Sequence, residues 1–213
     1  MTSYQTLAAS AAIALCAGTL SAQAQNLTFS GGVSLTSNYM SRGVTQSENR
    51  PALQFYGEVE ASGFYAGVWG STVRFPAPET DSVELDLYAG YRFSVGAASF
   101  DVGYARYYYD DSGNCCGEFY GLFEIDADPA TVFGGIHVDG ARGNTLNDIH
   151  LGVSYGFAER YTTSLTAGRA AGGVRYGVLG LGYSFNDNFS VEAAYHVTNA
   201  QRNQLVVSAS FDF

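Results

Sequence analysis

Apolar side chains recur at every second position along most of this chain, with polar side chains between them. In the segment 83–94, Val83, Leu85 and Leu87 have one parity, whereas Glu84 and Asp86 have the other. Successive side chains of a β-strand point to opposite faces, so this spacing predicts strands with one apolar and one polar face. No helical period appears from residue 25 onward.

The alternation predicts twelve strands with turns of alternating length. The strands are expected at 27–41, 51–61, 64–75, 83–94, 98–109, 117–127, 131–139, 148–157, 161–169, 174–185, 189–198 and 204–213. Short turns such as 62–63 and 186–188 alternate with longer loops such as 42–50 and 110–116. An even number of strands joined in this way is typical of bacterial outer-membrane proteins. We therefore predict an all-β fold, a transmembrane antiparallel up-and-down β-barrel of about twelve strands.

The residues of the polar face distinguish a membrane barrel from a soluble β-protein. A soluble β-sandwich or lipocalin-like barrel also shows alternation, but it would bury its apolar face in a dry interior. Here the alternate face carries carboxylates, among them Glu58, Glu60 and Glu124, which a dry core would not accommodate. The apolar face is therefore expected to meet lipid and the polar face to line a wet lumen.

The first 24 residues have the pattern of a cleaved export signal. An apolar stretch from Leu7 to Leu20 precedes Ala22-Gln23-Ala24, which fits an A-x-A cleavage site. The stretch is shorter than the roughly 20 residues that a helix needs to span a bilayer. We expect a signal peptide at 1–24, a single barrel domain at 25–213, and a location in the bacterial outer membrane.

Charge excludes one class of partner. The chain has ten basic residues, all of them Arg, and twenty acidic residues, for a net charge of -10. Phosphate contacts require a basic surface, so nucleic-acid binding is not expected.

The last predicted strand ends on an aromatic residue. Leu205, Val207, Phe211 and the terminal Phe213 share one parity. This end resembles the C-terminal signature by which outer-membrane proteins are recognised for assembly. We expect outer-membrane lipid and the barrel-assembly machinery as partners of the chain, with Phe211 and Phe213 as the assembly signal.

Three passages resemble one family. They are 37–46 (SNYMSRGVTQ) running into 50–54 (RPALQ), 63–71 (GFYAGVWGS) and 84–91 (ELDLYAGY). Together they resemble the TorF-like porins of Gram-negative outer membranes, a match that covers the N-terminal half. The resemblance implies a small barrel that forms a pore, and it supplies neither catalytic residues nor a substrate.

The predicted lumen is strongly acidic. A wall of one charge sign concentrates the opposite ion and excludes ions of its own sign. We therefore predict a passive, cation-selective diffusion channel for small cations or small polar solutes. A structural interpretation, in which these groups only cross-link or solvate the interior, stays open. The predicted lumen residues are Glu58, Glu60, Glu84, Asp86, Arg92, Asp101, Glu118, Glu124, Asp126 and Glu192.

Two loop features have several interpretations. Arg42, Glu48 and Arg50 lie in the first long loop, where they form either a ligand-binding rim or a solvated surface. Cys115 and Cys116 fall in the predicted external loop 110–116. They form a vicinal disulfide, pair between molecules or remain thiols.

Two other functions are alternatives to a pore. His196-Val197-Thr198-Asn199 loosely resembles a passage of lipid A deacylases, which suggests a barrel hydrolase acting on outer-membrane lipid. His196 and Thr198 have inward parity, however, whereas catalysis on lipid requires an outward site. His137 and His150 lie near Asp139 and Asp148 but have no nucleophile placed by spacing. The second alternative is a structural or adhesive barrel, which the short loops disfavour. We expect no enzymatic activity, cofactor or metal, and the sequence indicates no oligomeric state.

Overall fold

A computed structural model describes residues 27–141 and 145–213. The predicted signal peptide at 1–24 lies outside these residues. The only helical element described is a short 3-10 turn, η1 (Ala171–Gly173). None of the described helical segments is long and apolar enough to span a membrane.

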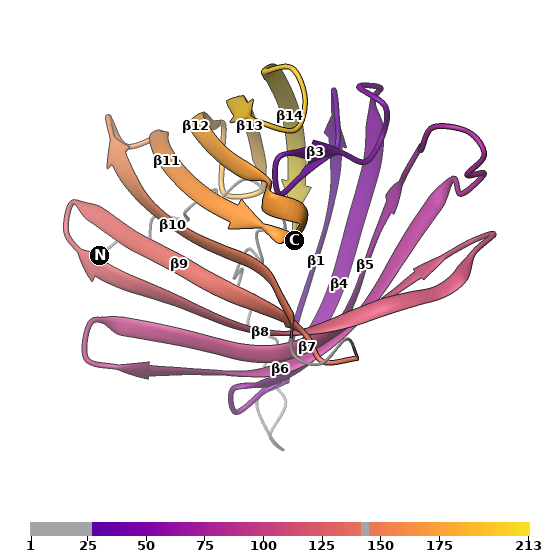
Figure 1. Cartoon of the computed structure of the whole chain (residues 1–213). Helices are drawn as coiled ribbons and strands as arrows, with labels where there is room; N and C mark the ends of the chain where they lie inside the picture. The colour runs from indigo at the N-terminus through magenta and orange to yellow at the C-terminus, as the bar shows by residue number, and fades with distance from the viewer. Residues whose placement is uncertain (1–26, 142–144) are drawn as a thin grey trace.

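Twelve antiparallel strands close into a barrel (Figure 1). Each strand pairs with its neighbours in sequence, and the first strand pairs with the last. Gly32 lies opposite Asp212 and Thr36 opposite Ser208 in this closing pair. The predicted fold class is thus confirmed. Around the barrel the order is β1 (Leu27–Thr36), β14 (Gln204–Asp212), β13 (Phe189–Thr198), β12 (Arg175–Ser184), β11 (Tyr161–Ala170), β10 (Thr145–Phe157), β9 (Ala130–Asp139), β8 (Gly113–Ala127), β7 (Ala98–Tyr109), β6 (Val83–Val95), β5 (Phe64–Thr72) and β4 (Ala52–Ala61).

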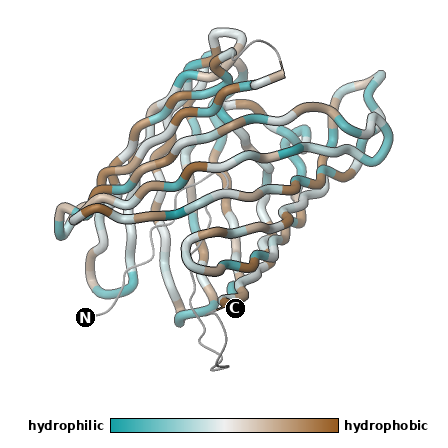
Figure 2. Tube along the Cα trace, turned by 90° about the horizontal axis from the view of Figure 1, so that it is seen from below, coloured by the Kyte–Doolittle hydropathy of each residue, from teal (hydrophilic) through white to brown (hydrophobic). Residues whose placement is uncertain are grey.

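The outer face of the barrel is apolar. Every strand of the barrel exposes at least one large apolar side chain, such as Phe29, Leu87, Leu151 and Leu179. Hydrophobic and hydrophilic positions alternate along the strands in Figure 2. The alternation that predicts the strands therefore also separates the two faces of the closed sheet.

Aromatic rings gather at the end of the barrel where the short turns lie. Phe157, Tyr161 and Tyr183 follow one another with centroids 5.4 and 4.8 Å apart. On the other side, Phe93 stacks on Phe100 at 5.2 Å. Bands of aromatic residues in this position are characteristic of barrels that cross a bilayer.

The short turns have the backbone geometry of tight hairpins. Ser62 and Gly63 join β4 to β5 with φ of 51° and 85°. Positive φ at both central residues is the type I′ turn, whose twist matches that of the flanking strands.

Two predicted boundaries differ most from the structure, and smaller differences include the end of β5 at Thr72 rather than 75 and the start of β10 at Thr145 rather than 148. The first strand ends at Thr36 rather than at residue 41, because the chain leaves the barrel wall there. It forms a separate hairpin of β2 (Met40–Ser41) and β3 (Val44–Thr45). The strand expected to begin at 117 already begins at Gly113, since β8 continues to pair with β7 through a bulge. Cys115 and Cys116 therefore lie on a strand and not in a loop.

Candidate pore and its constriction

The strand register places the predicted lumen carboxylates on one wall of the barrel. Glu58, Glu84 and Asp101 have the parity opposite to the exposed apolar residues of β4, β6 and β7. Beside β4, the adjoining strands β1 and β14 contribute small hydroxyl side chains. Ser208 donates to Thr36 Oγ1 at 2.9 Å, and the Ser210 and Ser34 hydroxyls lie 3.0 Å apart. The acidic wall is thus continued by strands whose inward side chains are mostly small hydroxyls, and Asp212 on β14 accepts from the Tyr56 hydroxyl of β4 at 3.1 Å.

Arg92 on β6 gathers three acidic residues near the short turns. Its guanidinium donates to Glu58 at 2.6 and 2.9 Å, to Glu60 at 2.9 Å and to Asp101 at 3.2 Å. It also lies over the Tyr65 ring, 3.7 Å from the centroid. One positive charge facing three carboxylates leaves this group, the Arg92 cluster, with a net negative charge.

The β2–β3 hairpin reaches into the lumen from the end with the long loops (Figure 1). Its tip is Arg42-Gly43, with φ of 48° and 84°. A side chain added at Gly43 would come within 2.8 Å of Tyr176 Cβ and 2.9 Å of Thr198 Oγ1. Glycine therefore meets two requirements at this position, a left-handed backbone and close contact with β12 and β13.

The hairpin is anchored on several sides. Gln201 accepts from the backbone N–H of Thr45 at 3.2 Å. The N–H of Arg74 donates to the Gln46 carbonyl at 2.8 Å, which joins the hairpin to the segment after β5. At the tip, Arg42 forms two hydrogen bonds with the carboxylate of Glu118 on β8, one of them 2.9 Å long. The hairpin therefore bridges from the β12–β13 side of the barrel to β8 and constricts the lumen.

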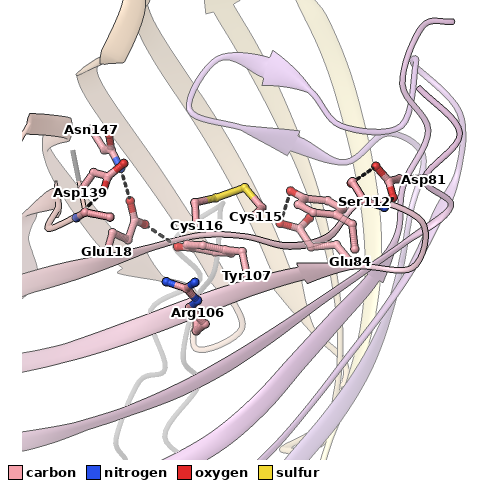
Figure 3. The surroundings of a disulfide bond; sticks show 12 residues. Asp81, Glu84, Arg106, Tyr107, Ser112, Cys115, Cys116, Glu118, Asp139 and Asn147 are labelled. Atoms are coloured by element: carbon pink, nitrogen blue, oxygen red, sulfur yellow. Dashed lines mark hydrogen bonds between the residues drawn. A yellow bond between two sulfur atoms is a disulfide. The ribbon is translucent and has the colours of Figure 1, made fainter. Parts of the chain in front are cut away.

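Glu118 is the centre of the second polar group of the lumen, the Glu118 cluster (Figure 3). Tyr107 donates to it at 2.5 Å and Asn147 at 3.0 Å, while His137 Nδ1 lies 3.1 Å from Oε1. Only 2% of its side chain is exposed. A buried carboxylate is costly unless it is paired and hydrogen-bonded, and these contacts together with Arg42 meet that need.

Two further carboxylates in this region have unsatisfied oxygens. Glu84 accepts from the Tyr109 hydroxyl at 3.0 Å through Oε1. Its other oxygen and Asp86 Oδ1 are buried without a hydrogen-bond partner among the described residues. Such oxygens favour a proton or a cation nearby.

The remaining predicted site residues are scattered. Glu192 is inward on β13 opposite Gly182, while Glu124 and Asp126 are exposed toward the short-turn end of β8. The three loop residues do not come together: Arg42 pairs with Glu118, Glu48 pairs with Arg74 at 2.9 Å, and Arg50 is exposed. The terminal Phe213 exchanges backbone hydrogen bonds of 3.0 and 2.9 Å with Gly31, and both it and Phe211 are exposed.

Cys115 and Cys116 form the vicinal disulfide that was one of three predicted alternatives (Figure 3). Cys115 lines a cavity of about 590 Å³ at the long-loop end, together with Gln46, Phe75, Asp81 and Ser112.

Sequence reasoning missed two functional features. Arg42 was assigned to a rim or a solvated surface, because no local pattern indicates that a loop turns inward. For Asp148 the sequence predicts a place on the polar face of the strand near His150, but not a role among the lumen charges. It is 1% exposed and accepts from His150 Nδ1 at 2.7 Å and from Tyr176 at 2.9 Å. His196, proposed for the hydrolase alternative, is also buried on the inner face.

Comparison with known proteins identifies the family of this chain and proteins with a similar fold. A family model described as a bacterial protein of unknown function (Gcw_chp) matches residues 21–211. No curated protein matches the sequence. The KdgM porin is similar in structure, with a TM-score of 0.64 and 13% identity over 86% of this chain and 99% of that one. The KdgM porin in complex with disordered oligogalacturonate gives a TM-score of 0.62 and 11% identity, over 86% of this chain and 99% of that one. At these identities the similarity shows the fold alone.

Proposed function

Because the chain belongs to the Gcw_chp family of bacterial proteins of unknown function, which supplies no activity, we propose a function from the barrel itself. The protein is an outer-membrane porin, a passive diffusion channel for small cations or small polar solutes. It is exported with a cleaved signal peptide at 1–24 and inserted as a barrel of residues 25–213. The apolar outer face and the aromatic band support this location.

The acidic inner wall carries the proposal of cation preference. Among the described residues, the basic side chains of the lumen are Arg92 and the hairpin's Arg42, and both face carboxylates. The buried oxygens of Glu84 and Asp86 that lack a hydrogen-bond partner among the described residues are further acceptors for a cation near the constriction. A low-dielectric wall focuses such a field along the channel. The resemblance to TorF-like porins supports a pore and indicates no ion preference.

The ligand of the similar KdgM porin is not carried over. That protein is in complex with oligogalacturonate, a polyanion. The acidic wall of this chain would repel a polyanion, so a cation or a neutral solute suits the lumen better.

Single-channel recording in planar bilayers under a KCl gradient tests the proposal. We expect conductance and a reversal potential of the sign that indicates cation selectivity. In the variant Glu84→Gln/Asp86→Asn the reversal potential should lie closer to zero. The matched control Glu159→Gln, in a short turn, should leave the reversal potential unchanged. Selectivity should also weaken between 0.1 and 1 M KCl, because the Debye length falls from about 10 Å to about 3 Å. Lack of conductance, or anion selectivity, would overturn the proposal.

The hydrolase alternative has its own test. Mass spectrometry of lipid A and phospholipid from cells with and without the protein should show no difference in acyl chains. A difference that is abolished by His196→Gln would favour the enzyme over the channel.

A further inference from the structure

We propose that His137, Asp148 and His150 form a binding site for one divalent transition-metal ion in the lumen. One ligand atom from each residue lies within 4.8 Å of the other two. His137 on β9 is the register partner of Asp148 on β10, and His150 follows two positions along the same face. The imidazole centroids of the two histidines are 6.0 Å apart.

His137 is oriented as metal ligands usually are, and His150 faces the second ligand, Asp148. His137 Nδ1 lies 3.1 Å from Glu118 Oε1, and His150 Nδ1 lies 2.7 Å from Asp148 Oδ2. Glu118 accepts a hydrogen bond, so Nδ1 of His137 carries the hydrogen and its Nε2 keeps the lone pair. His150 Nδ1 and Asp148 Oδ2 face each other directly, so an ion would replace the hydrogen between them and bind both atoms. Imidazoles that bind metals through one nitrogen commonly donate from the other to a carboxylate, which fixes the tautomer and the ring orientation.

The donor set selects the class of ion. Two imidazole nitrogens and one carboxylate oxygen suit Zn²⁺, Co²⁺, Ni²⁺ or Cu²⁺, whereas Ca²⁺ and Mg²⁺ prefer oxygen ligands. Bonds of about 2.0–2.1 Å place tetrahedral ligands roughly 3.3 Å apart. Small rotations of the side chains would bring the three ligand atoms, which lie within 4.8 Å of one another, to this spacing. The fourth position would be left for water or a passing solute.

The surroundings allow an ion to enter. The side chains of His137 and His150 are 17% and 19% exposed, so both reach the lumen. Glu118 and Asp148 supply two negative charges beside the site, and Arg42 supplies one positive charge that is already engaged by Glu118. A divalent cation therefore meets net negative surroundings at the level of the hairpin.

Cobalt titration of the folded protein tests binding directly. Protein prepared without a polyhistidine tag is titrated with Co²⁺ and followed by visible absorption. We expect ligand-field bands that saturate near one Co²⁺ per chain, and an affinity at least roughly tenfold lower in His137→Gln and His150→Gln. The control His196→Gln removes the other lumen histidine, which lies on β13, and should bind Co²⁺ like the wild type. Heat-modifiable mobility in gels confirms that each variant is folded.

Three results would overturn the site. They are no Co²⁺ binding up to roughly 1 mM, binding that survives both substitutions, and equal weakening by His196→Gln. In a separate competition experiment, Ca²⁺ that displaces Co²⁺ at equal concentration would show that the ion is bound by oxygen atoms and not by the imidazoles.

A functional consequence rests on the proposed channel. Zn²⁺ added to the long-loop side should reduce K⁺ conductance in the wild type and not in His150→Gln. The two proposals can fail separately. Co²⁺ binding without conductance would support the metal site and contradict the channel. Conductance without Co²⁺ binding would support the channel and contradict the metal site.

Discussion

Glu118 shows how one buried side chain organises the lumen. It accepts hydrogen bonds from Arg42, Tyr107 and Asn147, which come from the hairpin, β7 and β10. Because it joins three separate segments, its charge contributes both to stability and to the position of the hairpin.

Replacing Glu118 by Gln should destabilise the barrel by roughly 3 kcal/mol, because the substitution leaves the guanidinium of Arg42 without a counter-charge. The measurement is urea unfolding in lipid vesicles, followed by tryptophan fluorescence. Glu48→Gln is the matched control, since its ion pair with Arg74 is far more exposed, at 35% and 55%. Exposed pairs contribute about 0–1 kcal/mol. Equal effects of the two substitutions would contradict the assigned role.

Asp110 links two external loops in a pH-dependent way. It accepts from the N–H groups of Ser82 and Val83 at 2.8 and 3.1 Å and from the Ser82 hydroxyl. These bonds lower the pKa of its carboxyl to about 2. A pKa below the unfolded value of about 3.9 gives a contribution that is present above that pH and lost as the pH falls through about 2.

The amides of Ser82 and Val83 should therefore exchange slowly at pH 5 and faster near pH 2, relative to intrinsic rates. In Asp110→Asn they should exchange faster at both pH values. Amide exchange by NMR in micelles measures this, with Asp187→Asn in a short turn as the control. Unchanged protection in Asp110→Asn would show that the backbone alone holds the loop.

At the scale of elements, the β2–β3 hairpin forms the constriction, and the twelve long strands form the barrel wall. Thr36 at the end of β1 lies directly opposite Ala52 at the start of β4. The hairpin is therefore an insertion into a pair of strands that a two-residue turn could join.

Replacing residues 37–51 by Asn-Gly should leave the barrel folded and raise its conductance several-fold, because the lumen loses its constriction. Cation preference should persist, though weaker, since Glu58, Glu60 and Asp101 remain. Single-channel recording measures both quantities, and heat-modifiable mobility reports folding. An unchanged conductance would place the narrowest point elsewhere, with the Arg92 cluster the next candidate.

At the scale of the whole molecule, closure depends on the last strand. β14 pairs with β13 along its length and with β1 from Gly32 to Thr36. Phe213 continues this ladder with its two backbone hydrogen bonds to Gly31. The closing strand thus also carries the proposed assembly signal, Phe211 and Phe213.

Deleting Phe213 should lower the amount of folded barrel in the outer membrane several-fold, because both the terminal aromatic ring and two closing hydrogen bonds are lost. Phe213→Tyr keeps the aromatic ring and the backbone and should assemble normally. Quantification of the heat-modifiable band in membrane fractions distinguishes them. Normal assembly of the deletion would exclude Phe213 as the signal.

The sequence alone determined the number of barrel strands and which of their residues share a face, because alternation with period two is a local property of each strand. The predicted strands 98–109 and 189–198 coincide with β7 and β13. The parity of Glu58 and Arg92 likewise predicts the inner face for both side chains.

Only the tertiary structure decided what those residues meet. Arg42 and Glu118 are separated by 76 positions, and their pairing depends on a loop that turns inward. His137, Asp148 and His150 converge because β9 and β10 share one register, which alternation does not fix. Sequence periodicity specifies the direction of a side chain, whereas the constriction and the proposed metal site depend on distances that exist only after the barrel has closed.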